Sequence, residues 1–170
     1  MTRFTFSAVV LVAACVWPAR ADDDELKKTA KGAVEKMQAA TVKGDYETLI
    51  DLTHPKVVEK MGGRDKAVAT TKKIMKDLAD EGFVIKSMAA GQPSAPVRAG
   101  RDTYILVPTT TENTTPTGKA TVKSYVLGVS ADGGKTWQFV AGGTGPAEIR
   151  KLFPDLPKTF DLPEVKTDKN

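Results

Sequence analysis

The stretch Ser130-Ala131-Asp132-Gly133-Gly134-Lys135-Thr136-Trp137 decides how this chain folds. It places Asp-Gly and a second glycine between runs of alternating apolar residues, a strong hairpin signal because these residues adopt positive φ at little cost. The flanking runs cover residues 120–130 and 136–141, and another β-rich run covers residues 103–111. We therefore predict an antiparallel sheet, in which the Asp132 carboxylate accepts hydrogen bonds from turn amides and Trp137 faces the core.

The residues before the sheet show apolar positions at helical spacing. Gly44, Gly62-Gly63 and Gly82 mark points where helices end. The pattern predicts helices over residues 24–41, 45–52, 55–61 and 64–80. After Gly82 the period changes from 3.6 to 2, which predicts a strand from residue 83 to about residue 90 and a short edge strand at Val97.

The sheet is predicted to have one apolar face and one mixed face. Pro108 cannot donate a backbone hydrogen bond, which predicts an edge position or a bulge there. A short helix is predicted over residues 146–153, and residues 154–170 carry prolines and lysines, so we predict an extended surface tail or a disordered one. The mixed outer face would carry Thr121, Lys123, Tyr125, Thr136 and Gln138.

The first 21 residues have the pattern of a secretory signal. Arg3 precedes an apolar run, and Ala19-Arg20-Ala21 has the small residues of a cleavage site. The run is too short to span a bilayer. These features predict an exported protein, periplasmic or extracellular. An alternative is open, because Val12-Ala13-Ala14-Cys15 resembles a lipobox, in which Cys15 would carry a lipid anchor.

Composition narrows the class of protein further. Cleavage after Ala21 leaves 149 of the 170 residues and lowers the formal charge from +4 to +2. This length suits one domain, over residues 22–153, with a single core. The near-balance of charge argues against a nucleic-acid partner. His54 is the only histidine and Cys15 the only cysteine, so we predict no metal site and no cofactor.

The order of these elements resembles the nuclear transport factor 2-like (ketosteroid isomerase-like) family, a cone-shaped α+β fold. The resemblance covers residues 24–142. It rests on the long first helix, the corner Gly44-Asp45-Tyr46-Glu47-Thr48-Leu49, the turn at Gly62-Gly63 and the closing hairpin. It implies N-terminal helices packed in a curved antiparallel sheet around a conical cavity. Members include enzymes and pure binding modules, so the fold alone does not choose a function.

The hairpin turn also resembles the Asp-box of sialidase-type propellers. The motif Ser130-x-Asp132-x-Gly134-x-Thr136-Trp137 occurs once in the chain. A propeller needs about four to eight four-stranded blades, which this length and helical content exclude. We interpret the motif as a device that builds the hairpin.

Catalytic candidates are few. His54 precedes a proline at a helix start, where a capping role is the ordinary one. In the resembling isomerases a cavity aspartate acts as base beside tyrosine donors, which would here correspond to Asp51 with Tyr46, Tyr104 or Tyr125. Tyr104 and Tyr125 alternate with aliphatic residues and fit a wall or core position. None of these residues lies in a recognisable motif.

Two hypotheses follow. The first is an exported non-enzymatic domain that binds a small apolar ligand or a protein partner, as a monomer or weak homodimer. The second is a cofactorless cavity enzyme of isomerase, dehydratase or hydrolase type that uses Asp51 or His54. An ionisable side chain that projects into the cavity with a raised pKa would favour the enzyme. We favour the binding domain.

Overall fold

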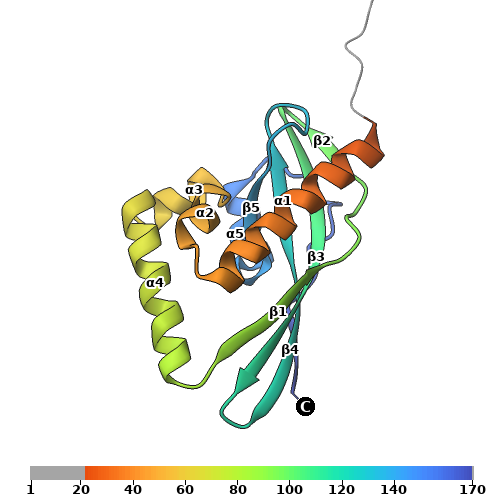
Figure 1. Cartoon of the computed structure of the whole chain (residues 1–170). Coiled ribbons are helices and arrows are strands. Elements are labelled where there is room, and N and C mark those ends of the chain that lie inside the picture. The colour runs from red at the N-terminus through yellow and green to blue at the C-terminus, as the bar shows by residue number, and fades with distance from the viewer. Residues whose placement is uncertain (1–21, 170) are drawn as a thin grey trace, which may run out of the picture.

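The structure, a computed structural model, describes residues 22–169 (Figure 1). The predicted signal segment, residues 1–21, lies outside the described residues. Four helices come first: α1 (Asp23–Lys43), α2 (Tyr46–Asp51), α3 (Pro55–Lys60) and α4 (Arg64–Asp80). Five strands follow: β1 (Val84–Ala90), β2 (Val97–Ala99), β3 (Asp102–Thr115), β4 (Gly118–Ser130) and β5 (Gln138–Ala141). The chain continues through η1 (Gly142–Thr144) and α5 (Pro146–Leu152) to β6 (Lys166–Lys169).

The predicted α+β class is confirmed, because the N-terminal helices contact a six-stranded antiparallel sheet. Its centre is the long β3–β4 hairpin, which pairs Thr103 with Ser130 at one end and Thr115 with Gly118 at the other. We call the end near residues 103 and 130 the upper half and the end near residues 115 and 118 the lower half. β2 and β5 flank the upper half, and β1 and β6 flank the lower half.

The upper half of the sheet is buried on both faces. On the first face, α1 crosses the sheet (Figure 1) and packs Leu26, Ala30 and Val34 against side chains that include Ile105 and Phe139. On the second face, α5 and the segment that follows it cover the sheet. That second core contains Tyr104, Leu106, Tyr125, Leu127, Val129, Val140, Ile149, Leu152, Phe153, Leu156, Phe160 and Leu162.

This second core differs from the sequence prediction in two ways. Tyr125 was placed on a mixed outer face, but its side chain is buried at 1 % exposure. The predicted surface tail contributes Leu156, Phe160 and Leu162 to the same core. The physical reason is that the upper half has two faces to bury, and α1 buries only one of them.

The hairpin turn has the structure that the motif predicts. Asp132 Oδ1 accepts hydrogen bonds from the backbone N–H groups of Lys135 and Thr136, each at 3.0 Å. The Thr136 hydroxyl donates to Asp132 Oδ2 at 2.7 Å. These bonds lower the pKa of Asp132 to about 2. Trp137 is 4 % exposed and donates from Nε1 to the Thr29 hydroxyl of α1 at 3.0 Å, so the predicted burial is confirmed.

The helical block joins the sheet at the end of α2. The Phe139 N–H donates to the Leu52 carbonyl at 2.8 Å, and the His54 N–H donates to the Phe139 carbonyl at 2.9 Å. α4 packs onto this block through Ala67 and Val68, the only residues of that helix that are buried. The remaining turns of α4 extend beside the lower half of the sheet, from which the helix stands apart in Figure 1.

Two irregularities shape the edge of the sheet. β1 has a bulge between Ile85 and Ser87, which adds local twist and bends the strand. Pro108 lies in β3 between the residues that pair with β2 and those that pair with β1, so it has no strand partner on that side, while on the other side it pairs with Tyr125 of β4. No helix within residues 22–169 is long and apolar enough to cross a membrane.

Candidate functional site

An open apolar cleft separates α4 from the lower half of the sheet. Its volume is about 310 Å³. α4 contributes Met75 and Leu78 to one wall. The other wall is the face of the sheet that α1 covers further up, because Thr111 and Val122 are register partners on the same two strands. The lining comprises Met75, Leu78, Phe83, Ile85, Met88, Thr111, Asn113 and Val122.

The cleft exists because the row of apolar side chains on α4 extends beyond the part of this helix that packs against the helical block. Ala67 and Val68 are buried against the helical block, while Leu78 is 38 % exposed and Ile74 is 50 % exposed. Phe83, at the turn into β1, is 42 % exposed. Large apolar side chains that gather at one opening point to an interaction site, because isolated domains rarely leave such patches uncovered.

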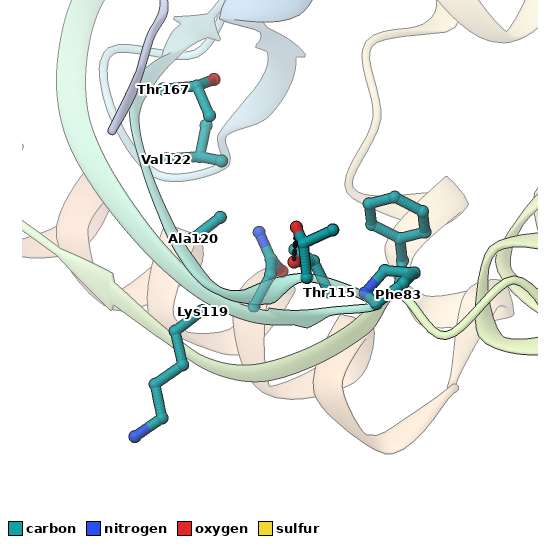
Figure 2. A pocket seen from close by; sticks show the side chains of 9 residues that line it. Phe83, Thr115, Lys119, Ala120, Val122 and Thr167 are labelled. Carbon is teal, nitrogen blue, oxygen red and sulfur yellow. Dashed lines mark hydrogen bonds between the residues drawn. The ribbon is translucent and has the colours of Figure 1, made fainter. Parts of the chain in front are cut away.

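A further hollow adjoins the cleft on the lower half of the sheet, and Figure 2 shows the side chains that line it. This second hollow, of about 320 Å³, shares Phe83, Asn113 and Val122 with the cleft. It ends against Thr167 of β6, the register partner of Val122. Figure 2 shows the Lys119 side chain directed away from the other labelled side chains. The two hollows therefore form one trough with apolar and hydroxyl-bearing walls.

A third hollow, of about 520 Å³, lies between α1 and β1 and shares Met88 with the cleft. Gln38 lines it from α1 and is 4 % exposed. Its Nε2 has no hydrogen-bond partner among residues 22–169. A buried donor without a partner costs ~1 to 3 kcal/mol, so this amide is a feature that needs an explanation.

The lining of the cleft suits binding better than acid–base chemistry. Among the described residues, the polar side chains of the cleft are those of Thr111 and Asn113. Both are neutral across the physiological pH range, and neither is an efficient general base. No ionisable side chain of the described residues lines this cleft.

Asp51, a sequence candidate for the base, lies away from the cleft in an exposed ion pair. Arg64 donates to its two carboxylate oxygens, from Nε at 2.7 Å and from Nη2 at 3.0 Å. The hydrogen bond and charge of Arg64 lower the pKa of Asp51. A carboxylate held in this form binds protons weakly, so the pair fits a link between α2 and α4.

His54 has the capping role that its position before Pro55 predicts. Its Nδ1 accepts the N–H of Lys56 at 3.2 Å at the start of α3. The ring stands edge-on to Phe153, with 4.8 Å between ring centroids. Burial, with a smaller effect from the Lys56 charge, lowers the pKa of His54 below 6.5. The imidazole is therefore neutral at pH 7.

The two strand tyrosines, Tyr104 and Tyr125, lie on the second face of the sheet, opposite to the cleft. The Tyr104 hydroxyl donates to Asp102 Oδ2 at 3.3 Å, and burial is the main cause that raises its pKa to about 12. The Tyr125 hydroxyl has no partner among the described residues, and burial raises its pKa as well. Both are buried, which confirms the wall or core position that their alternation with aliphatic residues predicts and contradicts the mixed outer face predicted for Tyr125.

The structure therefore brings two of the candidates together and separates the rest. His54 and Tyr104 both contact the ring of Phe153, which lies 5.9 Å from the Tyr104 ring between centroids. Asp51 and Tyr46 are both on α2, and the buried Tyr125 hydroxyl has no hydrogen-bond partner among the described residues. Within residues 22–169, no three His, Cys, Asp or Glu side chains gather as metal ligands would.

Sequence reasoning missed the residues that line the cleft. The spacing places Met75 and Leu78 on one apolar helical face and Phe83 at the start of a strand, but it assigns none of them to a site. The sequence carries one signal for the cleft, which is the length of the apolar face of α4. Its apolar positions run from Ala67 to Leu78, further than the short helices before α4 can cover.

Comparison with protein-family models, with curated proteins and with solved structures gives no significant match. The arrangement of N-terminal helices against a curved antiparallel sheet is consistent with a nuclear transport factor 2-like fold.

Proposed function

We propose that this chain is a non-enzymatic binding domain of the nuclear transport factor 2-like type, whose α4–sheet cleft holds a small apolar ligand. The observation that carries the proposal is the lining of the cleft. Leu78 and Phe83 are large, apolar and partly exposed at the opening of a concave site that no ionisable side chain of the described residues lines. Ligand pockets are typically concave and apolar with a few polar groups, which here are Thr111 and Asn113.

The binding of a neutral fluorescent probe tests this function. N-phenyl-1-naphthylamine carries no charge and fluoresces strongly in apolar surroundings. We expect saturable binding to the protein, and we expect Leu78→Asp to reduce the affinity at least tenfold, because burying an unpaired carboxylate in the cleft is costly.

Ile74→Asp is the matched control. Ile74 lies one turn earlier on α4 and is 50 % exposed, but it does not line the cleft. The same substitution there should leave the affinity for the probe within about twofold. The proposal fails if the probe does not bind, or if both variants lose binding equally while circular dichroism shows native helix content.

The alternative, a cofactorless cavity enzyme, has less support. Asp51 is paired with Arg64 and His54 caps α3, and neither lines the cleft. A protein partner in the cleft is the other alternative within the binding class, and sedimentation with and without the probe separates the two. We propose that the protein is monomeric or weakly dimeric.

We also propose export, on the signal pattern of residues 1–21. N-terminal sequencing of the mature protein should begin at Asp22. A mature N-terminus at a lipidated Cys15 would contradict this route in favour of an anchored protein.

A further inference from the structure

We infer that the ligand is a free fatty acid, with its acyl chain in the α4–sheet cleft and its carboxylate in the hollow between α1 and β1. This inference rests on the proposed function and adds the chemical class of the ligand. It combines two observations that are independent of each other. One is the apolar trough of the lower half, and the other is an unpartnered amide donor in a hollow that adjoins this trough.

The head group is assigned from the hollow between α1 and β1. The Gln38 side chain lines it, more than nine-tenths buried, with Nε2 lacking a hydrogen-bond partner among residues 22–169. An acceptor atom of a ligand would satisfy this donor, after a small movement of the amide. The bond would be charge-assisted if the acceptor were a carboxylate oxygen.

The charges around the same hollow favour an anion. Lys43 and Lys86 line it, and neither forms an ion pair within the described part of the chain. Glu35 is the one acid of the lining, and its carboxylate lies 4.0 Å from the Lys31 ammonium, which partly offsets its charge. The lining therefore carries two lysines without an ion pair and one glutamate whose charge is partly compensated.

The tail is assigned from the cleft that adjoins this hollow at Met88. From Ala90 to Val84, β1 extends for about 20 Å at the usual rise of a strand, and Ile85 and Met88 of this strand line the cleft. The cleft volume of about 310 Å³ lies at the small end of ligand pockets. It therefore suits one acyl chain better than the two chains of a phospholipid.

Calorimetric titration with three ligands that share a dodecyl chain tests the head group. We expect the protein to bind dodecanoate at least about tenfold more tightly than dodecan-1-ol, as a charge-assisted hydrogen bond implies. Dodecyltrimethylammonium should bind most weakly. Dodecanoate and dodecyltrimethylammonium are used below their micelle concentrations, and dodecan-1-ol is used below its solubility limit. Shortening dodecanoate to undecanoate should weaken binding about fourfold, because this factor corresponds to the free energy of burying one methylene group.

Two variants at one position tie the preference to Gln38. Gln38→Leu keeps the volume and removes the donor, so the preference for dodecanoate over dodecan-1-ol should fall below about threefold. Gln38→Glu places a carboxylate opposite the head group and should reverse the order, with dodecyltrimethylammonium now ahead of dodecanoate. Circular dichroism checks the fold of each variant.

The outcomes separate this inference from the proposed function. Equal affinity for the three head groups would overturn the fatty-acid assignment and leave the apolar cleft standing. A preference for dodecanoate that persists in both Gln38 variants would overturn the assigned place of the carboxylate. Failure of all three ligands and of N-phenyl-1-naphthylamine to bind would overturn the inference and the proposed function together.

Discussion

The upper and lower halves of the same β-hairpin have opposite environments. Residues 103–107 of β3 and 125–130 of β4 are buried in unbroken runs. Further down the same two strands, only Thr109 and Ala120 are buried. Strand pairing is continuous across both halves, so hydrogen bonding within the hairpin does not cause the difference.

The difference comes from what lies on each side of the hairpin. α1 and the segment after α5 close both faces of the upper half, whereas α4 stands beside the lower half without closing it (Figure 1). The upper half therefore holds the buried core of the sheet, and the lower half leaves apolar side chains partly exposed. The predictions below test whether stability and binding are divided in this way.

The largest expected effect is on an aromatic side chain of the upper half. Trp137→Ala should lower the free energy of unfolding by ~3 to 5 kcal/mol, because it leaves a cavity against α1 and removes the bond to Thr29. Phe83→Ala is the matched change in the lower half. The Phe83 side chain is 42 % exposed, so the loss in the free energy of unfolding should stay below ~1 kcal/mol.

Urea unfolding of both variants measures this contrast. Equal losses for Trp137→Ala and Phe83→Ala would show that the lower half contributes to stability as much as the upper half does. The division proposed here would then be wrong.

The second prediction concerns the turn that closes the upper half. The pKa of Asp132 is lowered from 3.8 to about 2 by the hydrogen bonds of Thr136, so the folded protein holds the ionised form. Its contribution to stability is complete above pH about 4 and is lost as pH falls towards 2. Asp132→Asn should be less stable at pH 7, and its stability should fall less between pH 4 and 2.

Thermal unfolding at a series of pH values measures how the stability of each protein changes with pH. Parallel pH profiles of the parent protein and Asp132→Asn would contradict the assignment. Other carboxylates titrate in the same range, so only the difference between the two profiles is diagnostic.

The smallest expected effect tests the packing of the second face. Tyr125→Phe removes a buried hydroxyl that has no partner among the described residues, so stability should stay constant or rise by up to ~1 kcal/mol. Tyr104→Phe, on the same face, removes a hydroxyl that donates to Asp102 and should cost ~0.5 to 1.5 kcal/mol. A clear loss in Tyr125→Phe would indicate a bound water at this hydroxyl.

The sequence predicts the local structure of this chain well. The predicted helix over residues 64–80 coincides with α4, and the Asp132 turn has the predicted bonds. These features depend on residues close together in the chain, whose spacing and turn chemistry are visible in the sequence. The burial of Trp137 is also predicted correctly, because this aromatic residue directly follows the turn.

The sequence does not show which surfaces cover each other. Leu156 and Phe160 lie among prolines and lysines, so their role in the second core depends on a sheet face that is distant in the sequence. The apolar face of α4 is equally periodic whether it is buried or lines a cleft. The cleft was therefore not predictable from periodicity, and Gln38 has no signal of its own within α1.

The bulge of β1 lies on a strand at the edge of the sheet, where natural proteins use bulges and charges to discourage aggregation. β1 pairs with β3 on one side only, so its other edge carries backbone groups that a second chain could extend. Beside this edge, Phe83 and Val84 are large and exposed. The bulge interrupts the regular ladder at Lys86, and a charged residue at that position opposes intermolecular strand pairing. The lower half can therefore leave apolar side chains exposed and still discourage the growth of fibres from its edge.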